Sequence, residues 1–300
     1  MNLDTAFQEF LTDCKYKNLS PRTIVYYKDT FRIFQTYCTK QELIKLEEIS
    51  SRVLKAYCSD LQERVSPGAV LSYLRSIRIF FGFCSREELI LVNPFKRFTM
   101  PKSPQVLQPY VKKEEWDVLF NMARMGDNNL RDVAILSILV DCGLRTTEVC
   151  TLKLSDVQKD TGMLKIFGKG SKERLIPVSR ITVKRINSYI TNERYKSQLE
   201  NLFLTFPDKG LTYRALRAIL QRLYKKTGLE EKTLHAFRRS LAVYWTKNSG
   251  DLISLSRVLG HTTLQMSAKY SVLDSADLKE IHSRVSPMRG WKWFERSFGI

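Results

Sequence analysis

Six side chains in the C-terminal two thirds of this sequence have the chemistry needed to attack a phosphodiester. They are three cations, two imidazoles and one phenol: Arg145, Lys169, His235, Arg238, His261 and Tyr270. Guanidinium groups can hold the non-bridging oxygens of a phosphate, and their charge stabilises the negative charge that builds in the transition state. A tyrosine hydroxyl can act as the nucleophile and hold the phosphoryl group covalently. The set therefore indicates phosphoryl transfer that needs no metal.

Arg145 stands at the predicted start of a helix. It follows Gly143, where the preceding helix is expected to end, and it precedes a new helix from about Thr146. A guanidinium in this place can bind a phosphate together with the amides of the helix N-terminus. Glu148, three residues later, is expected to orient the arginine or to cap the helix.

Lys169 lies between two glycines, at the tip of a β-hairpin that we expect over residues 164–178. Glycines allow close approach of the backbone to a ligand, so this lysine could enter a DNA groove and deliver a proton. Lys172 and Arg174 follow on the same hairpin. We interpret both as phosphate contacts or as solvated charges.

His235 and Arg238 are three residues apart and share one face of a predicted helix, so both could reach one phosphate. The imidazole would accept or donate a proton near neutral pH. His261 follows a predicted helix end at Gly260, and Tyr270 comes nine residues later. Taken singly, each motif is also compatible with a structural role, as an ion pair or a packed aromatic ring.

The elements that must position these residues can be predicted from apolar periodicity. The first hundred residues indicate four amphipathic helices, two of which begin at the Ser-Pro pairs at 20–21 and 66–67. Four prolines between 93 and 109 indicate an extended linker. Beyond it we expect the hairpin and helices at about 112–125, 130–142, 180–193, 212–227, 234–248 and 252–259.

The charge of the chain favours a polyanionic partner. It has 49 Lys+Arg against 31 Asp+Glu, a net charge of +18, and most of the surplus lies beyond residue 100. Each phosphate that such a surface neutralises releases condensed counterions. The six cysteines form no C-x-x-C pair, which is typical of a reducing compartment and argues against a disulfide framework or a zinc knuckle. With no long apolar run, the sequence indicates neither export nor membrane insertion.

In their order and spacing these motifs resemble those of the tyrosine recombinases, the family of lambda-type integrases and Xer proteins. The matching segments are G-L-R-T-T-E, the hairpin F-G-K-G-S-K-E-R, H-A-F-R-R and L-G-H-T-T-L-Q-M-S-A-K-Y. The compact length is more similar to Xer-like or transposon-borne members than to large phage integrases. One departure is Arg239, which stands where the family often has a second histidine.

The resemblance implies a mainly α fold with a small β-sheet: a four-helix SAM-like core-binding domain over residues 1–95, a linker over 96–109, a catalytic domain over 110–290 and a C-terminal tail over 291–300. It implies that Tyr270 forms a 3′-phosphotyrosyl link, that Arg145 and Arg238 hold the non-bridging oxygens, and that Lys169 protonates the leaving oxygen. His235 would assist proton transfer and His261 would hydrogen-bond the phosphate. Lys172, Arg174 and Arg239 would contact DNA.

The expected function is site-specific DNA recombination by a homotetramer on two duplexes that carry specific sites. We expect no cofactor, no metal and no membrane partner, and a cytoplasmic, nucleoid-associated protein. Two alternatives stay open at this point. One is a DNA-relaxing enzyme like the type IB topoisomerases, which use the same phosphotyrosine chemistry. The other is a non-catalytic DNA-binding regulator, because residues 255–270 also resemble a helix-turn-helix pattern.

Overall fold

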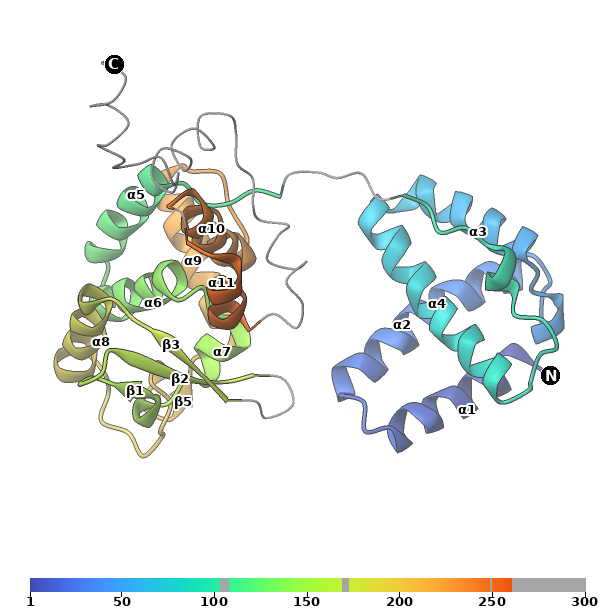
Figure 1. Ribbon diagram of the computed structural model, residues 1–300, viewed down its shortest axis with the longest axis horizontal. Coiled ribbons are helices and arrows are strands. Elements are labelled where there is room, and N and C mark those ends of the chain that lie inside the picture. The colour runs from blue at the N-terminus through green and yellow to red at the C-terminus, as the bar shows by residue number, and fades with distance from the viewer. Residues whose placement is uncertain (103–107, 169–172, 249, 261–300) are drawn as a thin grey trace, which may run out of the picture. The chain divides into compact units, whose positions relative to one another are not determined.

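The computed structural model describes residues 1–102, 108–168, 173–248 and 250–260 (Figure 1). The chain divides into two compact units, Met1–Leu107 and Gln108–Ile300. Both units are mainly helical, as expected, and the sheets of the described residues lie in the second unit. Within the described ranges, no helix combines the length and apolarity that crossing a membrane requires.

The first unit has the four predicted helices: α1 (Leu3–Tyr16), α2 (Pro21–Lys40), α3 (Ser51–Arg64) and α4 (Pro67–Arg86), with a 3₁₀ turn, η1 (Leu46–Glu48), before α3. Both Ser-Pro pairs start helices as expected. The Ser20 hydroxyl accepts a hydrogen bond from the Thr23 amide at 3.2 Å, and the Ser66 hydroxyl accepts one from the Ala69 amide at 3.4 Å. Each proline takes the first helical position, where no N–H is needed.

Aromatic rings fill the core of the first unit. Phe7 and Phe31 stack with ring centroids 3.6 Å apart, and Phe80 meets both edge-on. The part of the chain that follows α4 adds to this core, because the 3₁₀ turn η2 (Pro94–Arg97) buries Phe95 and carries Phe98 onto it. The first residues of the predicted linker therefore pack against the first unit instead of running free.

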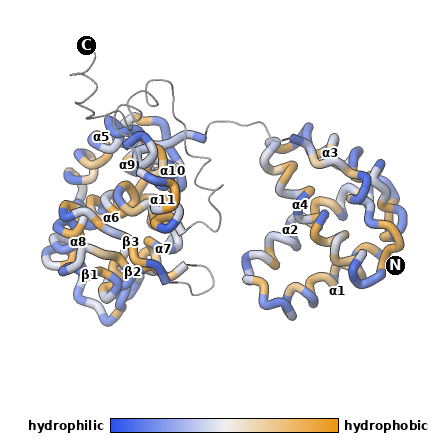
Figure 2. Tube along the Cα trace, viewed as in Figure 1, coloured by the Kyte–Doolittle hydropathy of each residue, from blue (hydrophilic) through white to orange (hydrophobic). Residues whose placement is uncertain are grey.

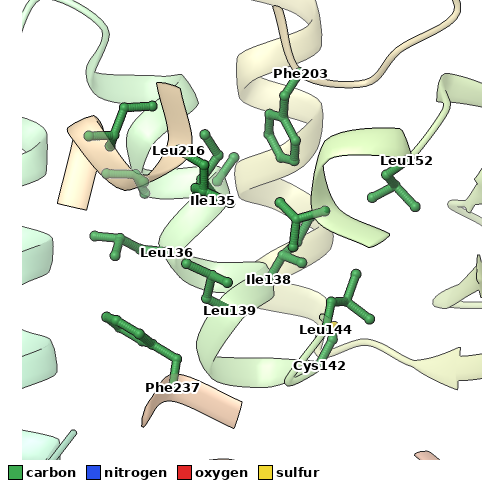
Figure 3. Packing of buried hydrophobic residues seen from close by; sticks show 14 of the residues in the cluster. Ile135, Leu136, Ile138, Leu139, Cys142, Leu144, Leu152, Phe203, Leu216 and Phe237 are labelled. Carbon is green, nitrogen blue, oxygen red and sulfur yellow. The ribbon is translucent and has the colours of Figure 1, made fainter. Parts of the chain in front are cut away.

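The second unit is built around α6 (Asn129–Asp141), in which nine consecutive residues, 131–139, are buried. A helix buried on all sides must be covered by neighbours. Here α5 (Lys113–Arg124), α8 (Arg180–Asn192) and α10 (Leu234–Lys247) pack against it. Figure 2 shows hydrophobic residues gathering along α6, and Figure 3 shows their packing with Leu144, Leu152 and Phe237.

The remaining elements of the second unit surround this core. They are α7 (Thr146–Thr151), η3 (Leu154–Asp156), α9 (Tyr213–Thr227) and α11 (Leu252–Leu259), and the strands β1 (Val157–Gln158), β2 (Met163–Phe167), β3 (Glu173–Pro177), β4 (Leu204–Phe206) and β5 (Lys209–Gly210). The predicted hairpin is confirmed as the antiparallel pair β2–β3, in which Ile166 is opposite Arg174. All six predicted helices of this unit are present. The strands β1, β4 and β5 are not predicted from the sequence. Each has only two or three residues, which is too short for an alternating pattern to be recognised.

Candidate active site

Arg145 is the N-cap residue of α7, as its motif predicts. Its backbone amide donates to Oε2 of Glu148 at 2.7 Å, and its Nη1 donates to Oε1 of the same carboxylate at 2.8 Å. Glu148 thus both caps the helix and orients the arginine, which confirms the role expected for it. The Nη2 group of Arg145 donates to the carbonyl of Gly260 at 2.8 Å. The side chain stays 38% exposed, so its guanidinium can still meet a ligand from solvent.

Arg238 lies on α10 and is buried. Its Nη1 donates to the carbonyl of Gly143 at 2.9 Å, and its Nη2 donates to the carbonyl of Leu259. Gly143 has φ +55°, a backbone conformation that residues other than glycine rarely adopt. Its position at the end of α6 agrees with the predicted helix stop. Arg145 and Arg238 therefore both donate to carbonyls at the end of α11, and Arg238 also holds the turn after α6.

His235 is exposed, one helical turn before Arg238. Partial desolvation lowers the pKa of its imidazole below the usual 6.5, and the positive charges of Arg239, Arg238 and Arg145 lower it further. The ring is consequently neutral at pH 7 and able to accept a proton. The charges of Arg145 and Arg238 thus act on His235, and its expected part in proton transfer stays a prediction.

Arg174 lies on β3, and its partners and exposure differ from those expected from the sequence. Nη1 and Nη2 donate to Oε1 and Oε2 of Glu148, each at 2.9 Å, and Nε donates to the carbonyl of Val258 at 3.1 Å. The side chain is only 14% exposed, so the interpretation as a solvated charge is wrong. Alternation along the strand could have revealed this: Arg174 is two residues from Ile176 and opposite Ile166, both buried, so it faces inward.

Glu148 is the residue on which these contacts meet. Its side chain is 4% exposed, and its two oxygens accept four hydrogen bonds, two from Arg145 and two from Arg174. Burial by itself raises the pKa of this carboxyl, but the hydrogen bonds and charges of Arg174 and Arg145 outweigh that effect and lower it. Glu148 is therefore ionised at neutral pH, and its one negative charge is shared by two guanidinium groups.

Arg239 donates from Nε to the carbonyl of Pro109 at 2.8 Å, at the start of the second unit.

Four predicted site residues, Lys169, Lys172, His261 and Tyr270, lie outside the described residues. Within the described part of the chain, no group of three or more His, Cys, Asp or Glu side chains could hold a metal ion. All six cysteines are free, and five of them are buried as small apolar side chains.

Comparisons with known proteins agree with this architecture. The model of the phage integrase family matches residues 109–276, and that of the phage integrase N-terminal SAM-like domain matches residues 7–90. The tyrosine recombinase XerC of Halalkalibacterium halodurans is 30% identical over 283 residues, which cover 90% of this chain and 93% of the relative. The XerC of a Staphylococcus aureus strain is 27% identical over 286 residues, covering 93% and 96%.

Solved structures share the fold. The Tn1549 transposon integrase in complex with transposon right end DNA gives a TM-score of 0.80 at 16% identity, covering 95% of this chain and 99% of that one. The XerH site-specific recombinase bound to its palindromic difH substrate gives 0.73 at 22% identity, covering 89% and 81%. This chain belongs to the phage integrase family and is a tyrosine recombinase, an enzyme that transfers DNA strands in site-specific recombination.

Proposed function

We propose that Tyr270 is the nucleophile of this recombinase and that Arg145 and Arg238 hold the scissile phosphate. The Tyr270 oxygen attacks phosphorus, a 3′-phosphotyrosyl bond forms, and the bond from phosphorus to the 5′ oxygen breaks. The leaving 5′ oxygen takes a proton from Lys169, and the tyrosyl proton passes toward His235. His261 hydrogen-bonds a non-bridging oxygen. The attack of a 5′-hydroxyl from another strand then reverses these steps and joins the new strand.

The observation that carries this proposal is the convergence of two guanidiniums on one helix end. Arg145 and Arg238 come from different helices, yet their Nη2 groups meet the successive carbonyls of Gly260 and Leu259. Two forked donors held this close can bind two oxygens of one phosphate. The neutral imidazole of His235 lies one turn from Arg238 and can take up a proton at pH 7.

The chemistry needs no external energy source, because the phosphotyrosyl bond retains the energy of the phosphodiester that it replaces. We further propose that residues 1–95 bind DNA as the core-binding domain, residues 96–109 link it to the catalytic domain at 110–290, and residues 291–300 form a tail. Lys172 and Arg239 would contact the DNA backbone. Recombination would use a tetramer on two duplexes, and the protein would be associated with the nucleoid.

Covalent trapping tests the nucleophile. A library of randomised duplexes, incubated with the enzyme, yields protein–DNA adducts whose sequencing identifies the site, and a nicked duplex of that site then gives the adduct quantitatively. We expect Tyr270→Phe to form none while it binds the duplex with unchanged affinity. A second tyrosine variant, Tyr213→Phe on an exposed helix start, serves as the matched control and keeps its activity. An adduct formed by Tyr270→Phe would refute the assignment.

A further inference from the structure

Three arginines from three different elements hold the last carbonyls of α11. Arg174 on β3 donates to Val258, Arg238 on α10 donates to Leu259, and Arg145 at the start of α7 donates to Gly260. The last carbonyls of a helix have no partner within it and carry the negative end of its dipole, so cations bind there favourably. Two of these arginines belong to the proposed phosphate clamp. The third, Arg174, has no part in it.

We propose that Arg174 is a positioning residue that holds the Arg145 guanidinium in the orientation required for the phosphate, acting through Glu148. This inference rests on the proposed function in one respect, the assignment of Arg145 to a non-bridging oxygen. It replaces the expectation from sequence that Arg174 touches DNA itself.

Each oxygen of the Glu148 carboxylate accepts two hydrogen bonds only when Arg174 is present. Each oxygen accepts one bond from Arg145, at 2.8 and 2.7 Å, and one from Arg174, at 2.9 Å. The two parallel bonds from Arg174 fix the carboxylate plane, because a guanidinium fork and a carboxylate match only in one relative orientation. With that plane fixed, the Nη1 group of Arg145 has one position in which to donate. Without Arg174, the carboxylate can rotate about its side-chain bonds, and Arg145 moves with it.

The hydrogen bonds of the two arginines separate their roles. Arg174 uses Nε, Nη1 and Nη2 for protein acceptors, whereas Arg145 is 38% exposed and donates to the protein from Nη1 and Nη2. A direct bond from Arg174 to DNA would require it to leave a carboxylate that is 4% exposed, and removing one of the two cations that pair with this buried charge is costly. Arg174 therefore acts on the phosphate through another residue.

A lysine cannot substitute for Arg174 in this arrangement. An ammonium group keeps the positive charge but does not present two parallel donors, and it cannot bond Val258 at the same time from a second nitrogen. Arg174→Lys therefore preserves the charge balance around Glu148 while it removes the fixed orientation. This variant tests positioning more cleanly than Arg174→Gln, which also removes the charge.

The test compares two substrates in single-turnover formation of the covalent adduct. One is the cognate nicked duplex, and the other carries a methylphosphonate at the scissile position, where a methyl group replaces one charged non-bridging oxygen. Arg145→Ala should lose far more rate on the phosphodiester than on the methylphosphonate, because the charge that Arg145 stabilises is absent there. We expect Arg174→Lys to show the same selective loss, about tenfold on the phosphodiester, below the 100-fold or more typical of removing a direct donor.

DNA affinity and a control variant complete the design. The Kd of Arg174→Lys for the duplex should stay within about twofold of the wild type, with an unchanged dependence on salt. Lys153→Gln, which removes a cation from an exposed pair with Glu200, should change neither rate nor affinity. A first-order rate constant does not depend on the amount of active enzyme, so the ratio between the two substrates remains informative even if a variant is less stable.

The possible results separate the proposals. An equal loss on both substrates means a general structural role for Arg174, and an unchanged rate means no role; either result overturns the inference. Weaker binding with a shallower salt dependence means that Arg174 contacts a phosphate directly, which overturns it as well. If Arg145→Ala shows no selectivity, or the wild type forms no adduct, the proposed function fails before Arg174 is considered.

Discussion

Replacing Glu148 with glutamine should destabilise the second unit strongly. The carboxylate accepts four hydrogen bonds and is the ion-pair partner of both Arg145 and Arg174. A glutamine amide can keep an acceptor toward the Arg145 backbone amide, but its NH₂ group faces guanidinium donors. Arg174, which is 14% exposed, then keeps its charge without a carboxylate.

The expected magnitude follows from this geometry. Breaking a buried ion pair by removing one partner costs about 3–5 kcal/mol. Two features place Glu148→Gln at the lower end, about 3 kcal/mol. Arg174 retains its bond to the Val258 carbonyl, and Arg145 is exposed enough for water to solvate it. For comparison, removing a charge from the exposed Lys153–Glu200 pair should cost less than about 1 kcal/mol.

Tryptophan fluorescence in urea measures this loss in the full chain. Residues 1–107 contain none of the four tryptophans (Trp116, Trp245, Trp291 and Trp293), so the first unit contributes no tryptophan emission, and Trp116 and Trp245 report the second unit. A shift in the urea midpoint without a change in slope gives the difference in unfolding free energy. Glu200→Gln is the matched control, because it makes the same chemical change at a side chain that is 71% exposed. A loss below about 1 kcal/mol for Glu148→Gln would contradict the reasoning.

The dependence on pH provides an internal check. Because the folded pKa of Glu148 is lowered, its stabilisation is complete above the ordinary value of 4.5 and is lost as the pH falls through the folded pKa. A protonated Glu148 resembles glutamine in charge. The difference between the wild type and Glu148→Gln should therefore be largest at pH 7 and shrink below pH 4.5. A difference that stays constant to pH 3 would show that packing, and not charge, is responsible.

Two further predictions concern the surroundings of the arginines. The imidazole of His235 should titrate below 6.5 by NMR, and Arg239→Gln should raise its pKa because one of the positive charges that oppose protonation is removed; an unchanged value would rule out that influence. Because this folded pKa is lowered, His235 also makes the fold less stable as the pH falls below 6.5. Gly143→Ala should destabilise the second unit by about 1–2 kcal/mol or more, since φ is +55° and a Cβ would lie 2.8 Å from Cδ2 of Leu241. Gly126→Ala, whose Cβ would meet only the Ala123 carbonyl oxygen at 3.6 Å, should change stability by less than about 1 kcal/mol in the same urea assay.

The helices of this protein can be predicted from sequence because their determinants are local. Ser20 and Ser66 each precede a proline, and each caps a helix with its hydroxyl. The apolar stripes behind them become the buried faces, as for Phe31 and Phe34. In the same way, Arg145 and Glu148 could be assigned to a helix start, because a capping interaction spans only three residues.

The role of Arg174 could not be predicted from its neighbours in the sequence alone. It belongs to a basic hairpin with Lys169 and Lys172, and composition alone treats the three cations alike. The alternation of the strand separates them, because Arg174 is in phase with the buried Ile176. A buried arginine needs an acceptor, but no local pattern points to Glu148, which is 26 residues away in the sequence. The strand pattern could predict burial, but only the tertiary structure identifies the partner.

The convergence of the arginines on α11 lies beyond any local pattern. The bonds from Arg145, Arg174 and Arg238 to this helix end span 115, 84 and 21 residues of sequence. Each arginine is recognisable by its motif or its strand phase, but nothing in those motifs specifies that successive carbonyls of one helix receive them. The helix end supplies what mutually repelling cations require, namely a set of fixed partial negative charges. Together with the Glu148 carboxylate, it lets three guanidiniums lie close together before any phosphate binds, so part of the clamp is built by the protein itself.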